Sequence, residues 1–253
     1  MIQRITLFGV PVDAMTRREA VLTLFELLDR RDRAAVFTPN PSMVLRCLRE
    51  PALKRLLSTG DLLLPDGVGI LLAARLAGHP IPCRMTGIDS AELLMALAER
   101  RGLSVFLLGG KGGVAKQAAQ RLRERFPNLR ICGTHHGYFD KTADSSENHA
   151  LMQVLRQAKP DLLLVGFGFP DQERWISENA KKLPDLRLAM GVGGSLDVWS
   201  GQKKRAPIPF RILGAEWLWR SVSRPRRAVE SLEFALLILT FRRMLKRCLL
   251  HVK

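Results

Sequence analysis

Short, mainly apolar runs recur along the chain, and they alternate with glycine-containing turns and stretches of helical spacing. Between residues 104 and 200 these runs lie at 104–108, 130–133, 161–165 and 186–190. Strands that alternate with helices at this spacing indicate βαβ units. We therefore expect an α/β protein with a mostly parallel sheet and helices on both faces.

The first forty residues predict a hairpin, a helix and a strand. Residues 5–8 and 10–12 have the pattern of a short hairpin, and Thr16 with Glu19 has the spacing of a capping box that starts a helix. Residues 34–37 predict the next strand. The apolar face of the helix is expected to contain Leu22, Phe25 and Leu28.

A proline-rich turn follows that strand. Prolines at 39 and 41 favour extended geometry and leave Thr38 and Asn40 as the polar side chains of the turn. The alternative interpretation is turn chemistry, in which Asn40 and Ser42 bond the local backbone. Helical spacing resumes after Ser42, and Pro51 is expected to start a second helix.

Asp66 lies where a short apolar run changes to a helical pattern. Residues 62–64 predict a buried strand, glycines and a proline interrupt it, and an apolar helix is expected from Ile70 to Gly78. Such strand-to-helix turns lie at the carboxyl edge of an open sheet, where ligands bind. Asp66 is therefore a candidate chemical group, and the alternative is that it caps the next helix.

The polar loop at residues 84–89 precedes an amphipathic helix. Asp89 or Ser90 is expected to cap that helix, which leaves Arg84 without a local role.

Glycine turns follow several predicted strands. Gly109 and Gly110, Gly166-x-Gly168, and Gly191-x-Gly193 can bring backbone amides close to phosphates, which favours a nucleotide or nucleotide sugar. Lys111 is not part of a Walker A loop, and neither Gly-x-Gly pair completes the dinucleotide fingerprint. These absences argue against an ATPase and an ordinary NAD dehydrogenase.

Nothing in the sequence indicates a metal site or a disulfide framework. The chain contains no Asp-x-Asp, and His135-His136 has no carboxylate or cysteine at ligand spacing. The cysteines are widely spaced, without CxxC, and the N-terminus lacks the pattern of a signal peptide, so we expect a cytosolic protein without a metal or other cofactor. The four cysteines are Cys47, Cys83, Cys132 and Cys248.

Charge concentrates at the C-terminal end. Of a net +16, residues 201–253 carry +10, with 13 basic and 3 acidic residues. The apolar run at 234–241 is too short to span a bilayer, but with Trp217, Trp219 and flanking arginines it fits a segment in the membrane interface. The alternative is a helix packed on the domain with a solvated basic face. Nucleic acid is disfavoured because no recognition motif accompanies the charge.

Length and charge together predict two parts: an α/β domain at residues 1–200 and a basic, amphipathic, helical appendage at 201–253.

Many stretches in order resemble the WecG/TagA/CpsF glycosyltransferases, glycosyltransferase family 26, over nearly the whole chain. The matching stretches are Thr38-Pro-Asn-Pro, Pro65-Asp-Gly-Val-Gly, Arg84-Met-Thr-Gly-Ile-Asp, Phe106-Leu-Leu-Gly-Gly, His136-Gly-Tyr-Phe, Gly166-Phe-Gly-Phe-Pro-Asp-Gln-Glu-Arg-Trp, Gly191-Val-Gly-Gly-Ser-Leu-Asp, Lys204-Arg-Ala-Pro and Glu216-Trp-Leu-Trp-Arg.

The resemblance implies a Rossmann-like core of the GT-E type on the inner face of a bacterial membrane. The implied reaction is metal-independent, inverting sugar transfer from a UDP-sugar to an undecaprenyl-diphosphate-linked acceptor. The commonest form moves N-acetylmannosamine from UDP-ManNAc onto GlcNAc-diphospho-undecaprenol, in the synthesis of teichoic acid or another surface polysaccharide.

The resemblance also assigns roles to individual residues. It places the proposed base on Asp66 and the active-site threonine on Thr38. Substrate-pocket polar residues fall on Asn40, Arg84 and Gln172.

The tail offers further cations for the diphosphates, because a guanidinium pairs well with phosphate oxygens. We expect Arg220, Arg224 and Arg227 to contribute first.

Two positions differ from the family pattern. Phe169 and Asp171 stand where a smaller residue and lysine are usual, and they bear on donor identity rather than on reaction class. UDP-glucose, UDP-GlcNAc and UDP-ManNAcA are alternative donors. A homo-oligomer is a possible assembly. The alternative function from a different class of protein is non-catalytic nucleotide binding at the membrane periphery.

Overall fold

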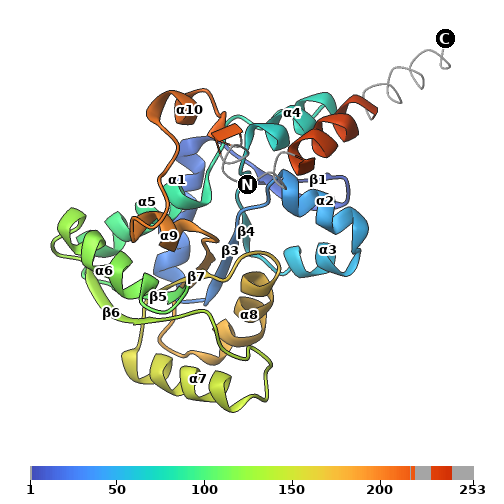
Figure 1. Ribbon diagram of the computed structural model, residues 1–253. Helices are drawn as coiled ribbons and strands as arrows, with labels where there is room; N and C mark the ends of the chain where they lie inside the picture. The colour runs from blue at the N-terminus through green and yellow to red at the C-terminus, as the bar shows by residue number, and fades with distance from the viewer. Residues whose placement is uncertain (1, 217, 220–228, 241–253) are drawn as a thin grey trace, which may run out of the picture.

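A six-stranded parallel sheet forms the centre of the molecule in the computed structural model (Figure 1), which describes residues 2–216, 218–219 and 229–240. The strand order is β4-β3-β8-β7-β5-β6, and each neighbouring pair is parallel. The prediction of a Rossmann-like α/β sheet is confirmed. The strands are β3 (Ala34–Phe37), β4 (Leu62–Leu63), β5 (Ser104–Gly109), β6 (Arg130–His135), β7 (Leu162–Gly166) and β8 (Leu188–Gly191).

Helices cover both faces of the sheet. Alternate strand residues point to opposite faces, so Phe37 joins one buried cluster and Val36 the other. The first cluster includes side chains of α2 (Pro41–Arg49), α3 (Ala52–Leu57), α4 (Val68–Leu76), α7 (Ser146–Ala158) and α8 (Asp171–Asn179). The second includes α1 (Arg17–Arg30), α5 (Gly87–Arg100), α6 (Val114–Arg125) and α9 (Ser195–Trp199). The short elements η1 (Ala180–Lys182) and α10 (Ile208–Ile212) complete the series.

The predicted N-terminal hairpin is confirmed as β1 (Gln3–Leu7) and β2 (Val10–Ala14). Asp13 fastens it to the main sheet. Its buried carboxylate accepts hydrogen bonds from Nε of Arg4 at 2.7 Å and from the backbone N–H of Leu63 at 2.8 Å. A carboxylate with these partners compensates for its own burial.

The capping box of Thr16 and Glu19 is confirmed, but the predicted apolar face of α1 is wrong in two of three positions. Leu22 and Phe25 are 50% and 40% exposed, and the buried face instead contains Ala20, Leu24 and Leu28. Residues four apart lie on one helix face, whereas repeated steps of three drift away from it. The ring of Phe25 lies 3.5 Å from the guanidinium carbon of Arg101.

One further prediction is corrected at a helix end. The N-cap of α5 is Thr86, not Asp89 or Ser90, and its hydroxyl accepts from the N–H of Asp89 at 3.2 Å. The helix α7 had no counterpart in the sequence interpretation, although Ser145 caps it and Leu151 and Leu155 have helical spacing.

The described parts of residues 201–253 pack on the domain. Phe234 is 3% exposed, lies against Gly69 of α4, and meets the ring of Phe8 edge to face at 6.3 Å. Glu233 accepts a hydrogen bond from Arg49 of α2 at 2.6 Å. Figure 1 shows these helical residues, in red, beside α2 and α4. No helix within the described residues is long and apolar enough to cross a bilayer.

The prediction for the fold concerns Gly109 at the end of β5. A Cβ there would lie 2.5 Å from the carbonyl oxygen of Gly166, and φ is +141°. We expect Gly109→Ala to lower the free energy of unfolding by about 1–3 kcal/mol or more in urea denaturation. Gly112→Ala is the matched control, because a Cβ at Gly112 meets nothing within 4 Å. Equal stability of the two variants would contradict the close approach of β5 and β7.

Candidate active site

The turns that follow β3 and β4 lie side by side at the carboxyl edge of the sheet. The parallel pairing of these strands continues beyond their ends, since the N–H of Asp66 donates to the carbonyl of Pro39 at 2.9 Å. The N–H of Met85 donates to the carbonyl of Pro65 at 2.9 Å, which adds the loop at residues 84–86. Three of the predicted polar stretches therefore meet in one place.

Thr38 lies against the first turn of α5. Its side chain is buried, and a Cβ on Gly87 would lie 3.2 Å from Oγ1 of Thr38. The glycine lets the helix N-terminus approach this hydroxyl closely. Because helix N-termini carry partial positive charge, Thr38 stands in a setting that favours an anionic ligand.

Asn40 uses its side-chain oxygen as the N-cap of α2, accepting from the N–H of Met43 at 3.1 Å. The turn-chemistry alternative is therefore confirmed for Asn40, and a substrate contact by the same residue stays a prediction.

Asp66 is half-buried, and the N-cap position of α4 belongs to Gly67 with φ 98°. The N-cap residue of α4 is therefore Gly67 and not Asp66. The carboxylate stands beside the Thr38 turn at the sheet edge where ligands bind.

Arg84 is held by residues beyond position 200. Its Nη2 donates to the carbonyl of Arg211 at 2.9 Å and lies 3.6 Å from Oε1 of the buried Glu216. The carboxylate and a substrate diphosphate would compete for the same guanidinium. Arg220, Arg224 and Arg227 lie outside the described residues.

The glycine turns after β5, β7 and β8 form the adjacent half of the edge. Gly109, Gly110, Gly168 and Gly193 have positive φ values of 141°, 70°, 86° and 53°, which glycine adopts without strain. Gly191 is required for a different reason, because a Cβ there would lie 2.6 Å from Nε2 of Gln172.

Gln172 joins two of these turns. Its Oε1 accepts from the N–H of Gly168 at 3.2 Å and from the N–H of Gly193 at 2.9 Å. Its Nε2 donates to Oε1 of Glu173 at 2.8 Å. The predicted contact of Gln172 with substrate is not tested by this geometry, in which the side chain holds the turns themselves.

Two features of the site had no place in the sequence interpretation. Lys141 lies 5.0 Å from the ring centre of Phe139 and 4.9 Å from that of Phe167, so a cation stands over two aromatic rings beside the β7 turn. Glu173 is fully buried on α8, and burial raises the pKa of its carboxyl to about 7. In the sequence, its burial was indicated only by its position just before the core residues Trp175 and Ile176.

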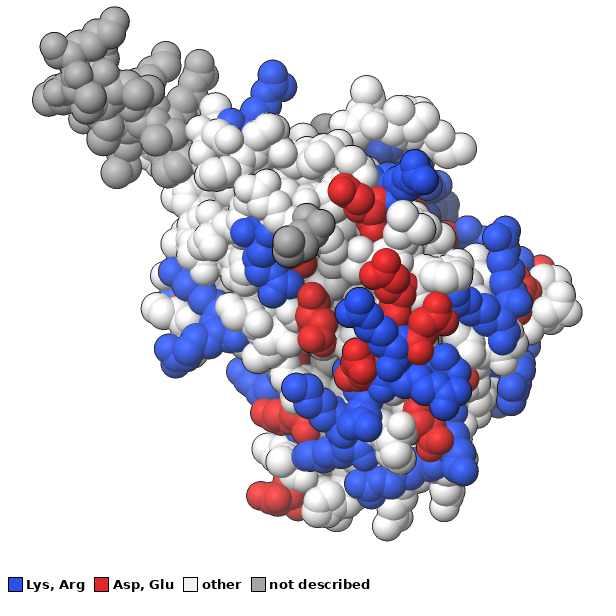
Figure 2. All heavy atoms as spheres, turned by 180° about the vertical axis from the view of Figure 1, so that it is seen from behind, with Lys and Arg blue, Asp and Glu red and all other residues white. Residues whose placement is uncertain are grey.

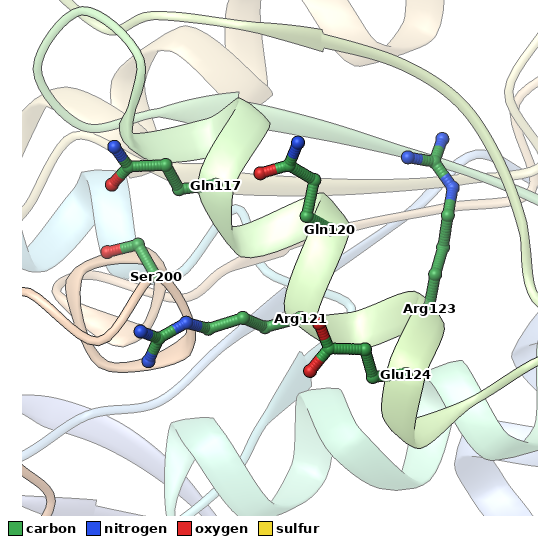
Figure 3. A pocket seen from close by; sticks show the side chains of 6 residues that line it. All are labelled: Gln117, Gln120, Arg121, Arg123, Glu124 and Ser200. Carbon is green, nitrogen blue, oxygen red and sulfur yellow. The ribbon is translucent and has the colours of Figure 1, made fainter.

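A surface hollow lies away from this edge. It measures about 640 Å³ and is lined from α6 and the end of α9 (Figure 3). Its long side chains belong to no strand-end turn, and Arg123 points away from Arg121 in this view. We therefore place the candidate site at the carboxyl edge. The lining residues are Gln117, Gln120, Arg121, Arg123, Glu124 and Ser200.

Residues 2–216, 218–219 and 229–240 contain no cluster of three or more His, Cys, Asp or Glu side chains that could bind a metal ion.

A parallel sheet with a carboxylate and several glycine turns along its carboxyl edge is the architecture of a nucleotide- or nucleotide-sugar-binding α/β protein. Residues 5–249 match the profile of the Glycosyl transferase WecG/TagA/CpsF family, and the chain belongs to this family.

Curated relatives point in the same direction. A protein of Staphylococcus aureus strain MRSA252 is 32% identical over 221 residues, which cover 87% of this chain and 84% of the relative. A protein of strain NCTC 8325 / PS 47 has the same identity and coverage. Both are named N-acetylglucosaminyldiphosphoundecaprenol N-acetyl-beta-D-mannosaminyltransferase.

The prediction for the site is that Glu173 lowers the free energy of unfolding by an amount that depends on pH. Its pKa is about 7 in the folded chain against an ordinary 4.5, so the folded state binds more protons between these values and loses stability as pH rises through them. Glu173→Gln should therefore gain stability over the wild type between pH 4.5 and 8, by up to about 3 kcal/mol. Urea denaturation at several pH values measures this, with the exposed Glu178→Gln as control. A stability difference between Glu173→Gln and the wild type that does not change with pH would contradict the raised pKa of Glu173.

Proposed function

We propose that this protein is an inverting glycosyltransferase that moves N-acetylmannosamine from UDP-ManNAc onto GlcNAc-diphospho-undecaprenol. Family membership and the names of the curated relatives support the reaction. The observation that carries it for this chain is the meeting of Asp66, Thr38 and the 84–86 loop beside the glycine turns.

Asp66 is the proposed general base. The acceptor hydroxyl oxygen attacks the anomeric carbon of the donor, its proton passes to the Asp66 carboxylate, and the bond from that carbon to the UDP oxygen breaks with inversion. Thr38, next to the N-terminus of α5, orients the reacting groups.

The leaving UDP needs positive charge or hydrogen-bond donors. The turns at Gly109, Gly110, Gly168, Gly191 and Gly193 are the proposed binding site of the diphosphate. The N–H groups of Gly168 and Gly193 already donate to Gln172 and that of Gly110 to the carbonyl of Gly166, so the proposed donors are other backbone amides of these turns.

Side chains add to this proposed binding site. Arg84 exchanges Glu216 for a phosphate oxygen. Asn40 and Gln172 are further proposed substrate contacts, and Arg220, Arg224 and Arg227 are the proposed contributors from residues 201–253. No step in this scheme uses a metal ion or another cofactor.

A panel of UDP-sugars with undecaprenyl-diphosphate acceptors tests the reaction. Transfer from UDP-ManNAc supports the proposal. A preference for UDP-glucose, UDP-GlcNAc or UDP-ManNAcA would show that the donor is that sugar nucleotide instead of UDP-ManNAc. Nucleotide binding without transfer from any donor would favour the non-catalytic rival.

The second part of the proposal is peripheral attachment to the inner face of a bacterial membrane through residues 201–253. Apolar side chains remain exposed on one stripe of the helical residues 229–240 and on the neighbouring α4 and α10. Figure 2 shows that this end of the molecule is mostly uncharged on its back face, whereas acids and bases intermix over the rest. The exposed side chains include Val68, Leu72, Ile208, Ile212, Val229, Leu232, Leu236 and Leu239.

Charge and acceptor chemistry support the same attachment. The net +10 of residues 201–253 favours anionic lipids, at about 1 kcal/mol per basic residue near the surface. A prenyl-linked acceptor stays in the bilayer, so the catalytic edge has to approach it. The membrane surface then acts as a partner of the enzyme.

The first prediction of this proposal is that Asp66→Asn lowers the transfer rate by about 10²- to 10⁴-fold. UDP affinity should stay within about threefold, because the glycine turns and Arg84 are unchanged. Radiolabelled transfer and calorimetry measure the two quantities, with the exposed Asp185→Asn as control. A variant that keeps more than about a tenth of the wild-type rate would remove Asp66 from this role.

The second prediction concerns the apolar stripe. Replacing Leu232, Leu236 and Leu239 by serine should weaken binding to anionic vesicles by roughly tenfold or more, because each exposed leucine loses its apolar contact with lipid. Transfer to a soluble short-chain acceptor should be unchanged. Sedimentation with vesicles measures binding, and Val154→Ser on α7 is the control. A triple variant that sediments like the wild type would refute this docking surface.

A further inference from the structure

The buried pair Gln172 and Glu173 lies between two turns of the candidate site. Oε1 of Gln172 accepts from the backbone amides of Gly168 and Gly193, and its Nε2 donates to Oε1 of Glu173. Both side chains are buried, and Glu173 is 0% exposed. Within the described residues, the side-chain hydrogen bond of Glu173 goes to Gln172, which in turn contacts the two turns.

A glutamine amide presents an acceptor at one end and a donor at the other, in nearly the same shape. If the Gln172 amide flipped, its NH₂ would face two N–H donors and its oxygen would face the Glu173 oxygen that now accepts. Glu173 and the two glycine amides thus favour the same orientation. In this orientation the two turns share one acceptor atom, which fixes their spacing.

Stability alone does not account for an acid at this position. Oε2 of Glu173 is buried and has no hydrogen-bond partner among the described residues. Burial of a carboxyl oxygen without a partner destabilises the folded state, and an apolar side chain of the same size avoids that penalty. A residue with such a cost is typical of a functional site.

A second contact holds the turn after β7, which contains Gly168 and Phe169. Nη1 of Arg46 on α2 donates to the carbonyl of Phe169 at 2.6 Å, and its guanidinium carbon lies 5.2 Å from the centre of the Phe169 ring. The β7 turn is thereby anchored to α2 through Phe169 and to the β8 turn through Gln172. The second anchor is the one that depends on Glu173.

We propose that Glu173 is a positioning residue for sugar transfer, which acts through Gln172 to set the spacing of the Gly168 and Gly193 turns that receive the donor diphosphate. This inference rests on the proposed function. It assigns Glu173 no contact with substrate and no proton transfer.

The experiment compares Glu173→Met, which removes the acceptor, with Glu173→Gln, which keeps one. We expect Glu173→Met to raise the donor KM and the Kd for UDP by about tenfold, with kcat within about threefold, since it weakens binding of the ground and transition states alike. Glu173→Gln should restore both constants to within about threefold of the wild type. The control is Glu178→Met, at an exposed position of the same helix.

A double-mutant cycle separates action through Gln172 from a general packing effect. In a Gln172→Met background, Glu173→Met should change the donor KM no further, because the route through the amide is already absent. Glu173→Ala replaces Glu173→Met throughout if the methionine variant does not fold.

Three results would overturn the inference: an unchanged UDP affinity in Glu173→Met, no rescue by Glu173→Gln, or full additivity in the cycle. A melting temperature that falls without any change in UDP affinity would assign Glu173 a structural role only. UDP binding by calorimetry needs no turnover. The inference is therefore tested even if the wild type transfers no sugar, a result that would overturn the proposed function alone.

Discussion

The close approach of glycines at the carboxyl edge of the sheet is the constraint on which the site depends. A Cβ on Gly166 would lie 2.8 Å from the carbonyl oxygen of Gly193, and one on Gly137 would lie 3.1 Å from Cα of Gly109. The turns after β5, β6, β7 and β8 can come together only because these positions carry no side chain. The same contacts bring the backbone of these turns to one edge of the sheet, where the proposed diphosphate site lies.

Carboxylates act differently at the two ends of the strands. At the start of the sheet, Asp61 accepts from the N–H of Ala35 at 2.7 Å and Asp161 accepts from the N–H of Ser104 at 2.9 Å, so both acids fix the register of a neighbouring strand. Asp66 follows a strand instead of preceding one, and the cap position after it is taken by Gly67. Position in the fold, rather than residue type, therefore distinguishes a structural acid from the candidate base.

Sequence reasoning predicted the features that depend on neighbours along the chain. The alternation of apolar runs predicted the sheet, and local spacing predicted the Thr16 capping box. Features with distant partners were missed: Arg84 meets a carbonyl 127 residues later, and Gln172 joins turns of two strands. The burial of Glu173 and the aromatic contacts of Lys141 likewise arise only when separate elements pack together. The local pattern around these residues does not specify such partners.

The described tail residues connect the proposed membrane surface to the proposed catalytic edge. Phe234 packs against Gly69, three residues after Asp66, while the outward stripe of the same helix exposes leucines. The segment before it supplies Glu216 and the Arg211 carbonyl to Arg84. The helical residues 229–240 therefore contact the start of α4, and Arg211 and Glu216 contact Arg84. In the proposed reaction, Arg84 has to leave Glu216 before it can bind a lipid-linked diphosphate, so the residues beyond position 200 bear on the proposed site as well as on the proposed attachment.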